Sequence, residues 1–166
     1  GGMTLRLNFD PLACIWNGRP PIPQGKIELQ SLEYAGETSA SKLCRLREAL
    51  RQKHCDGMLM SALDDIAWTL NMRGTDVHCN PVFVSYLVIE PEKAVLFIEE
   101  SKLTPAVSAY LESIPVALRP YEKVGNYLRK EYFAYNILLD PNETNSYLVA
   151  CAKEGRAAVV LTTSPI

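Results

Sequence analysis

Few side chains in this sequence could do chemistry. Its 166 residues include two histidines, His54 and His78, and a cysteine follows each of them, Cys55 and Cys79. Two histidines and two cysteines are a ligand set that could bind tetrahedral zinc. Adjacent residues of a helix or strand point in different directions, so each pair would need a special turn to reach one ion. Buried thiols and ordinary histidines are therefore the favoured interpretation.

Two other arrangements could support catalysis. Cys79 and His54 could form a thiol–imidazole pair for nucleophilic catalysis, although nothing near them in sequence supports it. Asp64 and Asp65 could act as paired carboxylates in acid–base catalysis, but their place at the start of a predicted helix explains them by capping and the helix dipole. The sequence has no phosphate-binding glycine loop, nucleophile elbow or His-Glu-x-x-His motif. We therefore expect no catalytic residue and no metal ligand in this chain.

One polar loop is the strongest candidate for a functional role. Arg73, Asp76, His78 and Asn80 crowd a short stretch between an apolar helix and a long apolar strand. Loops at the edge of a sheet often carry function. Two interpretations stay open: these residues face a ligand, or an Arg73–Asp76 pair braces its own turn.

Composition excludes several classes of protein. The 17 basic and 19 acidic residues give a net charge of −2, which lacks the basic excess of nucleic-acid-binding proteins. No stretch approaches the ~20 apolar residues of a membrane helix, and the first residues lack the pattern of a secretion signal. The five cysteines contain no Cys-x-x-Cys pair and are typical of free thiols in a reducing cytosol. We expect a cytoplasmic protein without nucleic-acid or membrane partners.

The periodicity predicts alternating helices and strands. Residues 1–36 hold four of the eleven prolines, so we expect an extended tail or linker from a preceding domain. Thr38 or a nearby serine caps a helix over 42–53 whose basic residues, Lys42 among them, form a solvated face. Residues 61–64 have the form of a capping box, and residues 73–76 that of a turn. Further helices are predicted over 63–70, 104–112, 121–133 and 144–152, and strands over 58–60, 82–89, 94–98, 116–118, 136–139 and 157–161.

This order of elements predicts an α/β fold with a mixed sheet flanked by helices. We place one domain at residues 37–163. Residues 164–166 are expected to begin a linker to a further domain, so the chain is expected to be a piece of a longer protein.

Two sequence blocks resemble a known family. Leu63 to Asp76, LDDIAWTLNMRGTD, resembles a block of the aminopeptidase P (Xaa-Pro aminopeptidase) family, and Asn80 to Tyr86, NPVFVSY, is similar to the block that follows it there. The resemblance covers nearly the whole chain. Shorter matching segments lie at 8–10, 16–20, 34–36, 42–43, 139–141, 144–145 and 164–166.

The resemblance implies that this chain is the end of one domain and all of a second, with a creatinase/prolidase N-terminal fold. It implies a C-terminal catalytic domain, absent here, that holds two divalent metal ions, commonly manganese. That domain would remove the N-terminal residue from peptides whose second residue is proline, in a full-length protein that we expect to be a homodimer. No metal ligand or catalytic histidine of the family falls within this chain, so the fragment alone is expected to be inactive. The loop of Arg73, Asp76, His78 and Asn80 is then the candidate to face the substrate entrance.

Two alternatives to this interpretation stay open. Related proteins with the same "pita-bread" catalytic fold have lost peptidase activity and serve as histone-binding scaffolds, so a binding module is the main alternative. The other is an autonomous enzyme that uses Cys79 or His78.

Overall fold

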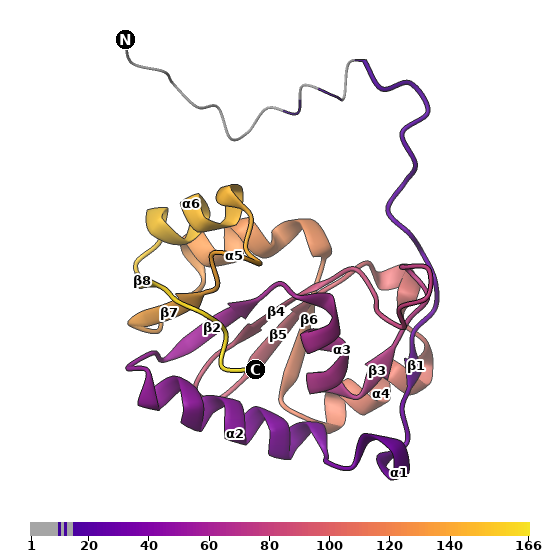
Figure 1. Cartoon of the computed structure of the whole chain (residues 1–166), viewed down its shortest axis with the longest axis horizontal. Coiled ribbons are helices and arrows are strands. Elements are labelled where there is room, and N and C mark those ends of the chain that lie inside the picture. The colour runs from indigo at the N-terminus through magenta and orange to yellow at the C-terminus, as the bar shows by residue number, and fades with distance from the viewer. Residues whose placement is uncertain (1–9, 11, 13–14) are drawn as a thin grey trace.

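A six-stranded sheet forms the centre of the computed structural model, which describes residues 10, 12 and 15–166. Its strands are β2 (Gly57–Met60), β4 (Tyr86–Ile89), β5 (Ala94–Phe97), β6 (Val116–Arg119), β7 (Asn136–Leu139) and β8 (Ala158–Leu161). Their order is β6-β5-β4-β2-β7-β8 (Figure 1). β4 runs antiparallel to both neighbours, and the other neighbouring pairs are parallel. This confirms the predicted α/β fold with a mixed sheet.

The strand directions create one edge of special interest. Since β4 alone is reversed, the carboxyl ends of the other five strands meet the amino end of β4 at the same edge. We call it the carboxyl edge. Ligands of open α/β sheets bind outside the carboxyl ends of strands, so this edge is where a site is expected.

Helices cover both faces of the sheet (Figure 1). One face carries α2 (Ser39–Gln52), α3 (Leu63–Leu70) and α4 (Pro105–Ser113), and the other carries α5 (Val124–Lys130) and α6 (Ser146–Glu154). Side chains alternate between the faces of a strand. Met58 and Met60 of β2 accordingly belong to the core under α2–α4, whereas Leu59 belongs to the core under α5 and α6. Each large apolar side chain buried in this way contributes about 1.5–3 kcal/mol.

Part of the predicted N-terminal tail is folded onto this body. β1 (Glu28–Leu29) pairs with β3 (Met72–Arg73), and α1 (Leu32–Ala35) follows β1. Ile27 is only 1% exposed and joins the core. Residues 32–35 form a helix and so differ from the expected extended chain, whereas Glu28 and Leu29 are extended but pair with β3. The domain boundary at residue 37 stays a prediction, and residues 1–9, 11, 13 and 14 of that tail lie outside the described residues.

One predicted strand and one predicted turn differ from the structure. The strand expected over 82–89 pairs only from Tyr86, because the Val84 N–H and the Val82 carbonyl are bonded to Asp76 instead. The turn expected over 73–76 is found instead at residues 78 and 79, inside the bridge between residues 77 and 80, and Arg73 belongs to β3.

Helix ends account for the other differences. The helix expected over 121–133 is a 3-10 turn, η2 (Tyr121–Lys123), followed by the shorter α5. The predicted capping box fails, since the N-cap of α3 is Ala62 and Ser61 Oγ is buried without a hydrogen-bond partner. α6 begins at residue 146 because Asn145 accepts the Leu148 N–H. The caps formed by Thr38 and Thr104 are as predicted.

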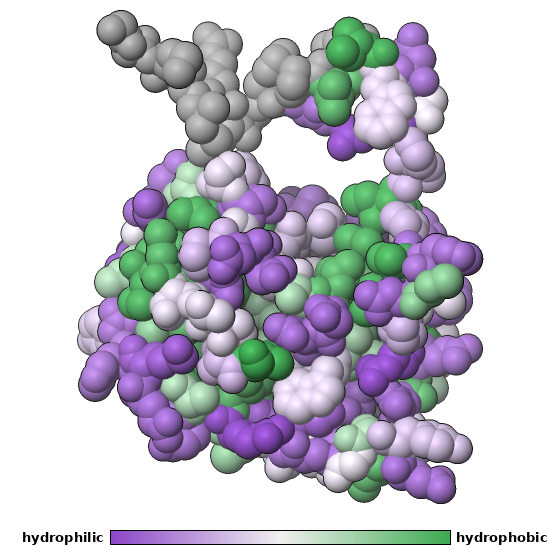
Figure 2. Space-filling view, viewed as in Figure 1, coloured by the Kyte–Doolittle hydropathy of each residue, from purple (hydrophilic) through white to green (hydrophobic). Residues whose placement is uncertain are grey.

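The surface mixes polar and apolar residues. Figure 2 shows purple residues over much of one face, with green residues in separate groups between them. Among the helices of the described residues, none combines the length and the apolar character of a membrane span.

Candidate functional site

The loop expected to carry function lies at the carboxyl edge, between β3 and β4. Its backbone folds back on itself, because the N–H groups of Gly74 and Asp76 donate to the carbonyls of Pro81 and Val82, each at 3.2 Å. A β-bridge between residues 77 and 80 closes the tip. The loop is therefore a small folded unit rather than an open coil.

A buried ion pair holds this loop. Asp76 Oδ2 accepts the Val84 N–H at 2.6 Å and pairs with the Lys102 ammonium of η1 (Glu100–Lys102). Both charged side chains are 0% exposed. The Lys102 carbonyl also accepts the Ile27 N–H at 3.0 Å. The pair thus joins the loop, η1 and the N-terminal segment in one place.

Arg73 has a different set of contacts. Its Nη1 donates to the carbonyls of Ala67 at 3.0 Å and Met72 at 2.8 Å, and burial lowers the pKa of its guanidinium. Ala67 lies in the last turn of α3, and its carbonyl also accepts the N–H of the C-cap residue Asn71, so Arg73 adds a second donor at this helix end. The interpretation that Arg73 pairs with Asp76 is therefore wrong, because Asp76 pairs with Lys102 and Arg73 caps a helix.

His78 and Asn80 occupy the exposed tip of the loop. Asn80 donates its N–H to the Val77 carbonyl at 3.2 Å, and Cys79 between them has a φ of +60°. The four predicted site residues thus divide into two groups. Arg73 and Asp76 brace the loop, while His78 and Asn80 are free to face a neighbouring domain or a substrate.

A second group of carboxylates lies at the carboxyl ends of β2 and β7. Burial, with Asp64, Glu143 and Asp140 nearby, raises the pKa of Asp65. Two backbone N–H groups lower the pKa of Asp140. The larger effect comes from Ser164, whose N–H lies 2.8 Å from Oδ2, and the smaller from Asn142, whose N–H lies 2.9 Å from Oδ1. The backbone around residue 164 is therefore tied to this edge. The predicted position of Asp64 and Asp65 in the first turn of α3 is confirmed, but no side chain caps that helix.

The zinc and Cys–His arrangements are not formed. His54 and Cys55 precede β2 at the opposite edge, whereas His78 and Cys79 precede β4 at the carboxyl edge. A strand of four residues separates them by about 13 Å. Cys55 is also buried in the core. Within the part of the chain that the structure describes, no group of three or more His, Cys, Asp or Glu could hold a metal ion.

Sequence reasoning missed two buried lysines. Lys102 follows two glutamates and a serine, a pattern typical of an exposed turn. Lys42 was assigned to a solvated face, yet it is 1% exposed, and its Nζ donates to Asn71 Oδ1 at 2.7 Å and to the Trp68 carbonyl at 2.8 Å. Burial lowers its pKa, and the charge of Glu37 opposes that shift. No local pattern marks either lysine, because their partners lie 26 to 29 residues away.

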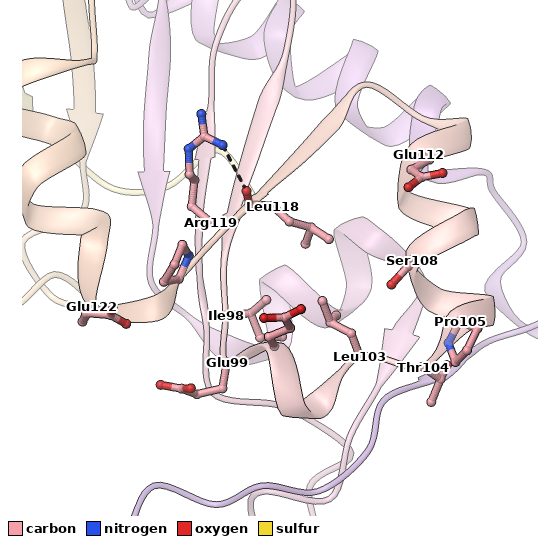
Figure 3. Close-up of a pocket in the computed structure, with 12 residues that line it drawn as sticks. Ile98, Glu99, Leu103, Thr104, Pro105, Ser108, Glu112, Leu118, Arg119 and Glu122 are labelled. Atoms are coloured by element: carbon pink, nitrogen blue, oxygen red, sulfur yellow. Dashed lines mark hydrogen bonds between the residues drawn. The ribbon is translucent and has the colours of Figure 1, made fainter.

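A groove at the same edge contains none of the four predicted site residues. This groove has a volume of about 680 Å³ and opens between α4 and the end of β6 (Figure 3). Its volume lies within the range of ligand-binding clefts.

Comparison with known proteins relates the whole described fold to one family. Residues 18–166 match the creatinase/prolidase N-terminal domain. A probable Xaa-Pro aminopeptidase P of Coccidioides posadasii is 39% identical over 130 residues, which are 78% of this chain and 21% of that protein. Xaa-Pro aminopeptidase 1 of Dictyostelium discoideum is 40% identical over 126 residues, 75% of this chain and 20% of that protein. The chain thus spans about a fifth of the length of these relatives.

Solved structures agree with this relationship. An X-prolyl aminopeptidase from Caenorhabditis elegans, described as a cytosolic enzyme with a di-nuclear active site, superposes with a TM-score of 0.80 and 29% identity. The match covers 91% of this chain and 26% of that one. A Xaa-Pro dipeptidase from Bacillus anthracis, with a TM-score of 0.59 and 16% identity, shares the fold alone.

Proposed function

This chain belongs to the creatinase/prolidase N-terminal domain family, and from that premise we propose that it is a non-catalytic domain of a Xaa-Pro aminopeptidase. The identity of 39–40% to relatives that carry that name is the observation that carries the proposal. The full-length protein would remove the N-terminal residue from peptides with proline in the second position. Its catalytic domain would follow this chain in sequence.

The donor groups of this chain support a catalytic centre elsewhere. Its described residues offer no set of three His, Cys, Asp or Glu side chains suited to a metal ion. The relative from C. elegans is described as having a di-nuclear active site. We therefore assign both metal ions to the domain beyond this chain, and derive no chemical step for the residues described here.

Turnover measurements test this assignment. The full-length protein should cleave a tripeptide of the form Xaa-Pro-Xaa, and this chain alone should not. Turnover by this chain that is lost in Cys79→Ala would instead place the chemistry here. A folded full-length protein without turnover would favour the alternative, a binding module of an inactive relative.

We propose further that the carboxyl edge faces the catalytic domain. The Ser164 N–H donates to Asp140 Oδ2 at 2.8 Å, which holds the backbone at residue 164 against this edge. The exposed loop tip with His78 and Asn80 lies at the same edge. This supports a role for the loop at the substrate entrance, with Arg73 and Asp76 as positioning residues.

Kinetics of the full-length enzyme test the entrance role. His78→Ala combined with Asn80→Ala should raise KM about threefold, a change of about 0.7 kcal/mol in binding. The melting temperature should not change, because both side chains are exposed. Glu33→Gln on α1 is the matched surface control. Unchanged kinetics with unchanged stability would contradict the entrance role but not the proposed peptidase.

The remaining properties follow from the same proposal. We propose manganese as the metal, a cytoplasmic location and a homodimer for the full-length protein. The description of the C. elegans enzyme as cytosolic supports the location. Metal analysis and sedimentation of the full-length protein test the other two.

A further inference from the structure

A groove at the carboxyl edge combines an apolar floor with an acidic rim. One wall is η1 with the start of α4, and the other is the end of β6 with η2 (Figure 3). Figure 3 shows Leu103 and Leu118 facing the space between these walls, with Glu112 on one side and Glu99 and Glu122 on the other. We call this the acidic groove and define it by its floor, Ile98, Leu103 and Leu118, and its rim, Glu99, Glu112 and Glu122.

The charge of the acidic groove is unbalanced. Four glutamates and one arginine give its lining a formal charge of −3, against −2 for the whole chain. The ion pairs among the described residues include none of these side chains. The arginine, Arg119, donates to the Leu118 carbonyl at 3.4 Å and extends away from α4 (Figure 3). The rim therefore attracts cations, because the described residues supply it with no ion-pair partner.

The apolar floor and the acidic rim together favour a cation that also carries apolar groups. A metal ion would need several carboxylates in one place, and the described residues form no such group. A small hydrophilic cation would leave the apolar floor unused. A peptide segment that alternates Arg or Lys with apolar residues can bury its apolar side chains on the floor and place its charges at the rim.

Helix α2 of a second copy would fit the groove less well than a free cationic segment. The exposed arginines of α2 already have partners, since Arg45 pairs with Glu37 and Arg51 with Glu48. Arg47 donates to the Glu90 carbonyl at 2.8 Å. We propose that the acidic groove docks a cationic, apolar peptide segment of another molecule. This proposal does not depend on peptidase activity.

Calorimetric titration of this chain with a capped hexapeptide, Leu-Arg-Pro-Leu-Arg-Leu, tests the proposal. Two triple variants provide the matched comparison, because both remove three exposed or half-buried carboxylates. The groove variant is Glu99→Gln/Glu112→Gln/Glu122→Gln, and the control is Glu33→Gln/Glu92→Gln/Glu131→Gln. The groove variant should bind about tenfold more weakly than the wild type, because each rim charge contributes a few tenths to 1 kcal/mol. The control should change affinity by less than about twofold, since its charges lie outside the groove.

Two further peptides separate the contributions of charge and floor. Replacing each Arg with Glu should abolish binding, and replacing each Leu with Ser should weaken it. Equal losses in the two triple variants would overturn the proposal, as would full affinity of the serine peptide or no binding to the wild type. Self-association of the wild type that disappears only in the groove variant would assign the groove to a second copy instead.

Discussion

Two neighbouring regions of the carboxyl edge carry charge in opposite ways, although η1 contributes to both. In the loop region, Asp76 and Lys102 are fully buried and paired, and three chain segments meet at that pair. In the acidic groove, Glu112 and Glu122 are exposed and without an ion-pair partner among the described residues. Removing one partner of a buried pair is costly, whereas a solvated charge contributes little to folding. Charge in the first region therefore serves the fold, and charge in the second is available to another molecule.

Breaking the buried pair should give the largest effect. Lys102→Met should lower the free energy of unfolding by about 3–5 kcal/mol, because it leaves the Asp76 carboxylate buried without a counter-ion. Urea unfolding followed by circular dichroism measures this. Lys123→Met, at an exposed lysine of η2, should change stability by less than about 0.5 kcal/mol.

A double variant sharpens the same point. Asp76→Asn/Lys102→Met should recover at least half of the loss, because no uncompensated charge remains in the core. A cost below about 1 kcal/mol for Lys102→Met would mean that the pair does not hold the loop.

Arg73 should give an intermediate effect. Arg73→Ala should cost about 2 kcal/mol, because the carbonyls of Ala67 and Met72 lose charged donors. Arg119→Ala is the comparison at the groove, where the guanidinium is exposed, and it should leave the unfolding free energy within about 0.5 kcal/mol of wild type. Equal losses in both variants would contradict the distinction between the two regions.

Lys42 is a buried ammonium that contacts no carboxylate, so its variant measures how burial changes the pKa of a charged group. Burial lowers its pKa from the ordinary 10.5, so between the lowered pKa and 10.5 the unfolded chain binds more protons than the folded one. The contribution of Lys42 to the free energy of unfolding therefore rises as the pH increases from the lowered pKa to 10.5. The difference between wild type and Lys42→Met should become more favourable to wild type as the pH rises toward 10.5. Parallel pH curves would show that burial does not perturb this ammonium.

Neutralising the rim of the acidic groove should give the smallest effect on folding. Glu99→Gln/Glu112→Gln/Glu122→Gln should change the unfolding free energy by no more than about 0.5 kcal/mol per substitution. Thermal unfolding against the Glu33→Gln/Glu92→Gln/Glu131→Gln control measures this. A loss above about 2 kcal/mol specific to the groove variant would mean that these carboxylates serve the fold, as Asp76 does.

The parts of the fold that local patterns determine could be predicted from sequence. The caps by Thr38 and Thr104, the strand pair β4–β5 and strand β7 all depend on residues close in sequence, and the family resemblance is confirmed by the match over residues 18–166. The role of Asp76 could not be predicted in this way. Its partner Lys102 is 26 residues away, and the same contact takes the Val84 N–H from the sheet and shortens β4.

The acidic groove lay beyond sequence reasoning for a similar reason. Its glutamates come from η1 and the residue before it, from α4 and from η2, and in the sequence each resembles an ordinary solvated residue. Only the parallel pairing of β5 and β6 brings them around one space. Exposed charge on separate elements carries no periodic signal, whereas apolar periodicity does.

A single measurement tests the contrast between the two regions most directly. Amide resonances of this chain, labelled with nitrogen-15, would be followed by two-dimensional NMR during titration with the capped Leu-Arg-Pro-Leu-Arg-Leu peptide. We expect shifts of the amides at residues 98–104, 112, 118, 119, 121 and 122, and no shifts of the amides at residues 74–84. Shifts centred on residues 74–84, shifts spread evenly over the chain, or no shifts at all would contradict the account.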